Sequence, residues 1–508
     1  MAQVMTLPVG SVPRARAART AASRDTTSQR DTPLLDALRS YDATAFHCPG
    51  HKRGRGVAPD LRAAVGDAML ASDVWLETGT YDRARRAAES LAARAWSAAR
   101  AYVLGNGSTS GNQAFLLAHL RDGDTAVVSR TLHTSTLTGL VLTGARPVYV
   151  SPRVHPATGT GLGIEPADVA AALAAHPGTR LVSVVSPSYT GVCSDTAGIV
   201  AAAHAAGAVA YVDEAWGPHL AFHPDLPQHA MAAGADGAVT SVHKLLPALS
   251  SGSLLLAGPA VDGDRLDAVV RTTQTTSPLL PLLASVDAAR RDLAVDGLRR
   301  VDRALGLAAA ARRTLSGLPG LRLPDPEELG VRLDPLKLAV DVTGLGISGN
   351  AAESVLRASC GIAPEGADLT SVYLVVGLGD DESTVAALAA GFRRLVALAP
   401  RPGAARVHTL RAGSARLCTP PAPGTAPLTP RQAFLGASRA VPLAAAVGEV
   451  CAELVTPYPP GIPVVAPGET VTAEAVAYLT EALAAGAHVH GTADPALRTV
   501  RVVESSHA

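Results

Sequence analysis

Between residues 102 and 257 the chain alternates short apolar runs with segments of helical composition. This alternation constrains the fold more than any other feature, because several of the runs are apolar throughout rather than at every second position. Strands of that kind are buried on both faces, which is typical of a parallel sheet covered by helices on both sides. The pattern predicts strands over residues 102–104, 125–129, 147–150, 181–186, 208–212, 238–242 and 253–257.

Polar residues follow four of these predicted strands. His133 follows the strand 125–129, and the segments 186–189, 213–216 and 241–244 directly follow the next ones. The carboxyl ends of parallel strands meet at one edge of a sheet, where α/β proteins bind their ligands. An imidazole, hydroxyls, a carboxylate and a lysine should therefore meet at one edge.

Lys244 is the most informative of these residues. Only three of the 44 basic side chains are lysines, at positions 52, 244 and 337. A lysine amine can form a Schiff base with an aldehyde cofactor, whereas an arginine cannot. We therefore interpret Lys244 as the residue that carries pyridoxal phosphate (PLP). A lysine that merely reaches solvent from the end of a strand is the alternative.

The other groups that PLP needs are also present. A buried carboxylate keeps the pyridine nitrogen protonated, and Asp213 at the end of an apolar strand is the candidate. Glu214 should then point the other way, because side chains alternate along a strand. His133 can stack on the ring. Each residue also has an ordinary explanation, as a turn acid or a loop histidine.

The Gly/Ser/Thr-rich stretch 105–112 precedes an apolar helix predicted over residues 113–120. Free backbone N–H groups and the positive end of the helix dipole make such a turn a phosphate cradle. Ser108, Thr109 and Ser110 are the expected phosphate contacts. A helix start capped by serine or threonine is the alternative.

Bulk properties exclude several other classes. Formal net charge is zero, which argues against nucleic acid and anionic membranes as partners. No apolar run reaches the roughly 18 residues of a membrane helix. The five cysteines are scattered without a CxxC pair, so we expect reduced thiols and no metal site. We expect a cytoplasmic protein with a disordered tail over residues 1–32.

Taken together, the motifs resemble one family, the bacterial Orn/Lys/Arg decarboxylases of PLP fold type I, in the short form without an N-terminal wing domain. The resemblance covers about residues 33 to 500. It is carried by FHCPGHKRG (46–54), NGSTSGN (106–112), SPSYTGVCSD (186–195), VDEAWGPH (212–219), SVHKLLPALS (241–250), TTSPLLPLLASVDAAR (275–290), DPLKLAV (334–340), GIAPEGAD (361–368) and TPYPPGIPVVAPGE (456–469).

The resemblance implies a role for each matching residue. Lys244 would form the Schiff base, Asp213 would pair with the pyridine nitrogen, and His133 would stack above the ring. Lys244 or His243 would protonate the product carbon. The remaining cofactor contacts would be Ser108, Thr109, Ser110, Ala215, Ser241, His243, Thr275 and Thr276, and Trp216 would line the substrate site. Thr275 and Thr276 would reach the neighbouring subunit's cofactor, which implies a homodimer or a dimer of dimers with shared active sites.

The resemblance also implies the domain organisation. It predicts a PLP-binding major domain (33–296), a small α/β domain (297–399), a linker (400–430) and a C-terminal module (431–508).

The implied activity is decarboxylation of arginine, lysine or ornithine to the amine and CO2. Arginine is favoured by the likeness to the shorter members. Glu77, Glu214, Glu365 and Glu469 could each receive the substrate cation. The sequence departs from the family pattern at Thr134, Ser251, Leu279 and Leu280, which leaves the substrate pocket open. An aminotransferase or aldolase-like enzyme of the same fold, a non-catalytic regulator and a scaffold without cofactor stay as alternatives.

Overall fold

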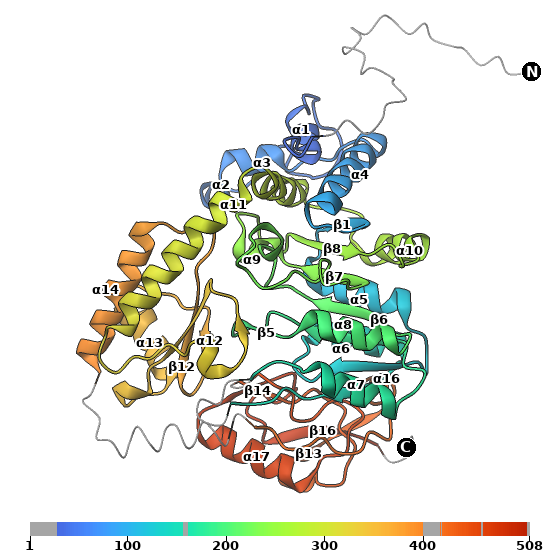
Figure 1. Cartoon of the computed structure of the whole chain (residues 1–508). Helices are drawn as coiled ribbons and strands as arrows, with labels where there is room; N and C mark the ends of the chain where they lie inside the picture. Colours follow the sequence, from blue (N-terminus) through green and yellow to red (C-terminus); the bar gives the residue numbers. More distant parts are fainter. Residues whose placement is uncertain (1–27, 156–160, 400–416, 418, 459–460, 505–508) are drawn as a thin grey trace, which may run out of the picture.

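The computed structural model describes residues 28–155, 161–399, 417, 419–458 and 461–504 (Figure 1). Its centre is a seven-stranded sheet with the order β1-β8-β7-β6-β4-β2-β3. The five strands from β7 to β3 are parallel, and β8 runs antiparallel to both of its neighbours. The strands are β1 (Arg100–Leu104), β2 (Thr125–Ser129), β3 (Arg146–Val150), β4 (Leu181–Val185), β6 (Val209–Asp213), β7 (Gly237–Thr240) and β8 (Ser253–Ala257). The predicted mostly parallel sheet is confirmed.

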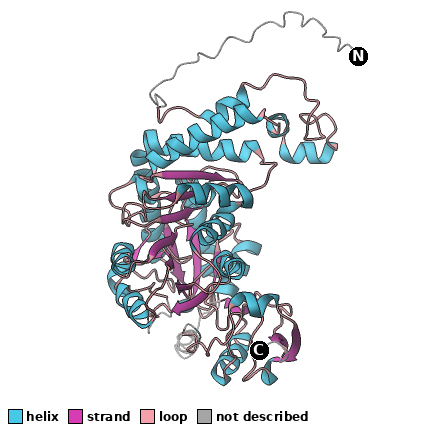
Figure 2. Ribbon diagram, turned by 90° about the vertical axis from the view of Figure 1, so that its right-hand side faces the viewer, coloured by secondary structure: helices cyan, strands magenta, loops and turns pink. Residues whose placement is uncertain are grey.

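Helices cover both faces of this sheet, and the strands lie between them in the view of Figure 2. Alternate strand residues enter different cores: Ala210 and Val212 of β6 lie in one apolar cluster and Tyr211 lies in the other. The Tyr211 face is covered by α5 (Gly107–His119), α6 (Thr134–Thr143) and α10 (Gly263–Thr273). The opposite face is covered by α4 (Thr78–Ala95), α7 (Pro166–Ala175), α8 (Thr196–Ala205) and α11 (Leu280–Ser316).

Several predicted strand bounds differ from the observed ones by one or two residues, and two errors affect the edge where the polar residues gather. Helix α5 begins at Gly107 rather than at residue 113, so the Gly/Ser/Thr stretch forms its first turns. Strand β7 ends at Thr240, and residues Val242–Leu245 form the short helix α9 instead of extending the strand. Sequence reasoning missed both because glycine, serine and β-branched residues have low helix propensity, which tertiary packing overrides here.

Helix α11 leads from the large sheet into a smaller α/β unit. It crosses the predicted boundary between residues 296 and 297, and Asp296 departs there from helical geometry (φ −142°). The unit has a three-stranded antiparallel sheet of β10 (Lys337–Asp341), β12 (Ser371–Val375) and β11 (Gly366–Ala367). It also contains α12 (Pro326–Leu329), α13 (Gly349–Ser359) and α14 (Glu382–Leu398). The pair β5 (Val192–Cys193) and β9 (Arg332–Leu333) links it to the large sheet.

The C-terminal region has a separate apolar core and packs beside α6. It consists of α16 (Pro430–Leu435), β13 (Ser438–Pro442), β14 (Thr456–Tyr458), α17 (Ala473–Ala484), β15 (His488–His490) and β16 (Thr499–Val503). Arg431 donates a hydrogen bond from Nε to the Val141 carbonyl at 2.8 Å, which joins α16 to α6. Most of the predicted linker, residues 400–416 and 418, lies outside the described residues.

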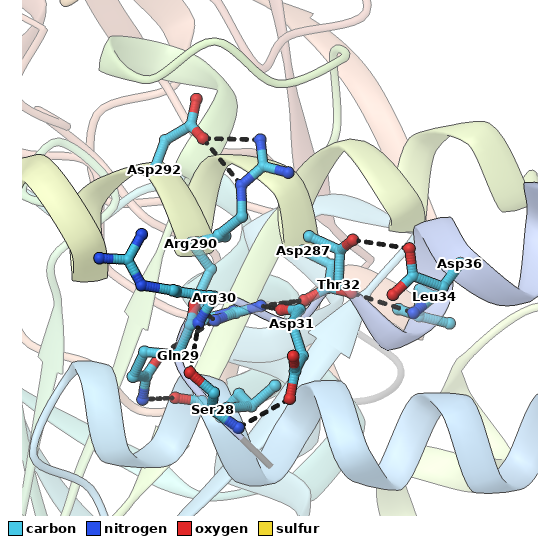
Figure 3. A network of polar contacts seen from close by, with 12 residues as sticks. Ser28, Gln29, Arg30, Asp31, Thr32, Leu34, Asp36, Asp287, Arg290 and Asp292 are labelled. Atoms are coloured by element: carbon cyan, nitrogen blue, oxygen red, sulfur yellow. Dashed lines mark hydrogen bonds and ion pairs between the residues drawn. The ribbon is translucent and has the colours of Figure 1, made fainter.

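The N-terminal segment before α1 (Pro33–Arg39) is held by two buried residues of α11 (Figure 3). Arg290 donates to the Gln29 carbonyl at 2.8 Å and also to the Asp31 carbonyl. Asp287 accepts a hydrogen bond from the Leu34 amide at 3.0 Å. Residues 28–32 are thus ordered, contrary to the predicted tail, whereas residues 1–27 lie outside the described residues. Helices α2 (Pro59–Val65) and α3 (Asp67–Ser72) follow.

The sequence predicted no membrane helix, no metal site and reduced cysteines. No helix in the described part of the chain is both long and apolar enough to cross a bilayer. Within the same residues, no group of three or more His, Cys, Asp or Glu side chains could hold a metal ion. Cys48, Cys193, Cys360 and Cys451 are free thiols, and Cys418 lies outside the described residues.

Candidate active site

A cavity of about 500 Å³ lies at the carboxyl ends of β2, β4, β6 and β7. It brings together nine of the residues singled out from the sequence: Ser108, Thr109, His133, Asp213, Ala215, Trp216, Ser241, His243 and Lys244. Ser110, Thr275 and Thr276 do not line it. The Ser110 hydroxyl donates to the Gly107 carbonyl at 2.8 Å and accepts from the Gln274 amide at 2.8 Å, so it turns away from the cavity. Thr275 and Thr276 are exposed.

Lys244 enters the cavity from α9, one turn after β7. Its ammonium nitrogen lies 4.1 Å from the centroid of the Trp216 ring. Burial lowers the pKa of Lys244, although the carboxylates of Asp213 and Glu365 act in the opposite direction. A lower pKa raises the neutral fraction of the amine, which is the form that attacks an aldehyde carbon.

Asp213 ends β6 with only 3% of its surface exposed. One oxygen accepts from the Asn112 side-chain amide at 2.8 Å and the other from the Ala215 backbone N–H at 3.1 Å. Asn112 is itself held by the Tyr211 hydroxyl, which donates to its carbonyl at 2.7 Å. None of the ion pairs formed by the described residues includes Asp213. A protonated pyridine nitrogen would supply the cation that a buried carboxylate requires.

His133 is connected to the same network. It is the N-cap of α6, and its Nδ1 accepts from the Ser135 backbone N–H at 3.2 Å. The ring therefore keeps Nδ1 unprotonated and carries its proton on Nε2. The ring is accessible through the cavity, yet its partial burial lowers the pKa of His133. Lys244 adds to this effect and Asp213 opposes it. The Ser135 hydroxyl bridges His133 and Asn112 at 2.8 and 2.9 Å.

A further group of cavity residues suits a phosphate. The Ser108 and Ser241 hydroxyls lie 2.7 Å apart, and Thr109 lines the cavity beside them in the first turn of α5. First-turn N–H groups of a helix have no partner within the helix and favour anions. His243 donates from Nδ1 to the Gly252 carbonyl at 3.0 Å, which orients its ring. The lysine, carboxylate, imidazole and hydroxyl groups thus fit PLP.

Aromatic residues form the remaining wall, and sequence reasoning assigned only Trp216 to it. Tyr189 lies edge-on to Trp216 with 6.1 Å between ring centroids, and Tyr458 contributes from the C-terminal region. A Cβ at Gly366 would lie 1.9 Å from the Tyr189 hydroxyl, so only glycine permits this close approach. Of the four departures from the family pattern, only Ser251 lines the cavity.

The four acidic candidates for cation recognition differ in their contacts, and these contacts show which of them can act at the cavity. Glu77 caps α4 through the Gly79 and Thr80 amides, each at 2.9 Å. Glu214 turns away from the cavity, as predicted, and pairs with His229 at 2.8 Å. Glu469 is buried against Arg130. Glu365 is exposed, and its charge acts on Lys244 and on Tyr189, whose pKa is raised mainly by burial. Of the four, Glu365 alone reaches the site electrostatically.

The fold is that of the PLP fold-type-I class. The structure of alanine–glyoxylate aminotransferase from Nostoc sp. superposes on the chain with a TM-score of 0.52 at 17% identity and covers 66% of it. Lysine decarboxylase A from Pseudomonas aeruginosa has a TM-score of 0.79 at 22% identity, and covers 94% of this chain and 81% of its own.

The chain belongs to the Orn/Lys/Arg decarboxylase family. The model of the family's major domain matches residues 32–328, and that of its C-terminal domain matches residues 420–494. The arginine decarboxylase of Bacillus subtilis (strain 168) is 33% identical over 495 residues, covering 95% of this chain and 99% of that relative. The arginine decarboxylase of Halalkalibacterium halodurans is 34% identical, covering 94% and 99%. The family resemblance read from the motifs is thereby confirmed.

Proposed function

We propose that the protein is a PLP-dependent decarboxylase that converts arginine to its amine and CO2. The observation that carries the proposal is the placement of Lys244 and Asp213 in one cavity that a pair of serine hydroxyls also lines. The 33–34% identity to proteins named arginine decarboxylase over nearly the whole chain supports arginine as the substrate.

Each group of the cofactor has a holder among the cavity residues. Lys244 would hold the aldehyde carbon, Asp213 the pyridine nitrogen and His133 the ring face, whereas Ser108 and Thr109 would hold the phosphate. When bound, PLP supplies an electron sink for the bond that releases CO2.

Protein groups then account for orientation and proton transfer. Asn112 and the Ala215 amide fix the Asp213 carboxylate, so its negative charge is preorganised and needs no rearrangement. The lowered pKa makes the Lys244 ammonium a stronger acid than that of an ordinary lysine, and Lys244 is therefore the candidate proton donor to the substrate carbon after CO2 has left. His243, which also lines the cavity, is the second candidate donor.

We assign the substrate guanidinium to the side of the cavity near Tyr189 and Glu365. An aromatic face and a carboxylate are the groups that recognise a guanidinium. A guanidinium is planar and can donate two parallel hydrogen bonds to a carboxylate, whereas the compact ammonium groups of lysine and ornithine match this geometry less well. The exposed Thr275 and Thr276 stay predicted contacts to the cofactor of a second subunit in a homodimer.

The test measures CO2 and amine formation from arginine, lysine and ornithine, together with the visible absorption of the lysine-bound cofactor. We expect CO2 from arginine without any keto acid, and loss of the absorption band in Lys244→Ala. A band that persists in Lys244→Ala refutes the assignment of Lys244. Turnover that requires a keto acid identifies an aminotransferase, and binding of PLP without turnover of any amino acid identifies a regulator.

A further inference from the structure

A short loop of the large sheet and a short segment of the small α/β unit contact each other at both of their ends. The first is the loop 216–219, which follows β6 and begins with the cavity residue Trp216. The second is the segment 334–337, which leads into β10. At one end His219 Nε2 lies 3.2 Å from Asp334 Oδ1, and both side chains are fully buried. At the other end Lys337 Nζ lies 3.4 Å from the centroid of the Trp216 ring.

Lys337 also holds the second aromatic residue of the cavity wall. Its Nζ donates to the Tyr189 carbonyl at 2.9 Å, and the Asp334 amide donates to the Gly191 carbonyl at 2.8 Å. Gly191 has a φ of +94°, and a Cβ there would lie 2.9 Å from the Lys337 Cβ. The stem of Lys337 is thus packed against the turn that carries Tyr189.

Lys337 is 4% exposed and does not line the cavity, so it can act on the substrate only through other residues. Burial lowers the pKa of Lys337 to about 7, with Asp334 opposing and Lys244 adding to the effect. A methionine would fill the same volume without the desolvation cost of an ammonium. What the ammonium adds is directional: a π-face contact and a hydrogen bond that fix two cavity residues relative to each other.

We propose that Lys337 is a positioning residue that sets substrate affinity by fixing Trp216 and Tyr189 as one wall of the active site. It couples the small α/β unit to that wall across the domain boundary. Because the Lys337 Nζ already contacts the Trp216 ring, the substrate guanidinium is directed away from Trp216 and toward Tyr189. This inference rests on the proposed arginine decarboxylase activity for its kinetic readout.

The kinetic test is a double-mutant cycle of Lys337→Met and Trp216→Leu, measured as kcat and KM for arginine. We expect Lys337→Met to raise KM about tenfold and change kcat less than threefold. In the Trp216→Leu background we expect a smaller rise of about threefold in KM, because only the hydrogen bond to the Tyr189 carbonyl is then left to lose. Arg312→Met is the matched control, since Arg312 donates to the Lys337 carbonyl at 3.3 Å without being a cavity residue. An unchanged KM in Lys337→Met, or an equal rise in both backgrounds, overturns the proposal.

A second readout does not depend on turnover. The tryptophan fluorescence of each protein minus that of its Trp216→Leu counterpart reports on Trp216, and Lys337→Met should change this difference whereas Arg312→Met should not. An unchanged difference refutes the contact even if the enzyme is active. A changed difference in a protein that releases no CO2 from arginine refutes the proposed function alone. If Lys337→Met does not fold, Lys337→Gln replaces it in both measurements.

Discussion

Replacing Arg130 by methionine should weaken the contact between the C-terminal region and the active site, lower the stability of the protein and raise KM. Arg130 follows β2 and is 3% exposed. Its guanidinium donates to the Pro463 carbonyl at 2.9 Å, the Val464 carbonyl at 3.0 Å and the Glu469 carboxylate at 2.8 Å. These partners belong to the segment 456–469, which also places Tyr458 and Gly461 at the cavity.

The magnitude follows from what remains after the substitution. Glu469 would stay buried, with the Ala466 amide at 2.7 Å as a remaining donor. Breaking a buried ion pair by removal of one partner costs about 3–5 kcal/mol. The second substitution Glu469→Gln removes the unpaired charge and keeps an acceptor for Ala466. We therefore expect Arg130→Met/Glu469→Gln to be more stable than Arg130→Met by about 1–3 kcal/mol.

The assay is urea unfolding of the full-length holoenzyme, followed by circular dichroism, with KM for arginine measured in parallel. Arg439→Met is the matched control, since its pair with Glu449 at 2.8 Å is 44% and 32% exposed and should contribute under about 1 kcal/mol. An Arg130→Met midpoint equal to that of Arg439→Met, at the same m-value, would refute the reasoning. KM should rise in Arg130→Met because Tyr458 loses its support.

Three further predictions concern single carboxylates. Asp213→Ala should retain the cofactor weakly and lose roughly 100-fold or more in kcat, since a preorganised charge is removed; near-normal kcat would contradict its role. Glu365→Gln should raise KM for arginine about fivefold, or roughly 1 kcal/mol for an exposed ion pair, with kcat little changed in steady-state kinetics. Burial raises the pKa of Glu89 to about 7 despite its partner Arg85. Between pH 4.5 and 7 the folded protein therefore keeps a proton that the unfolded chain has lost. The free energy of unfolding should accordingly fall by about 3 kcal/mol as the pH rises through this window. Urea unfolding across this window should show that slope and lose it in Glu89→Gln.

The sequence predicted the proposed cofactor-binding residues of the cavity because they lie at the ends of predicted strands. Asp213, Ser241 and Lys244 all follow apolar runs, and strand ends of a parallel sheet meet by geometry alone. Asn112 was missed as the partner of Asp213, although an asparagine inside an apolar helix is a visible signal, and it is only 1% exposed. A buried amide is expected to have partners, but no pattern in the chain says which.

The substrate end could not be predicted in the same way. Tyr189 follows a predicted strand, so its place at this edge could be expected. Tyr458 comes from the C-terminal region, and Lys337, which contacts the wall from outside the cavity, comes from the small α/β unit. Their positions depend on how these two units pack on the large sheet. Glu469 shows the same limit, since the sequence offered it as a substrate contact and packing buried it against Arg130.

This division has a consequence for how the active site can change. The groups proposed to hold PLP all come from the large sheet and its helices, so substitutions elsewhere should leave the reaction class intact. The aromatic wall has Trp216 and Tyr189 from the large sheet, and Lys337 of the small α/β unit fixes both. The Arg130–Glu469 pair joins the large sheet to the C-terminal region, which supplies Tyr458. Buried contacts between units can thus alter substrate affinity without touching either substrate or cofactor. In this chain, the determinants of specificity should therefore be sought at those inter-unit contacts as well as in the cavity lining.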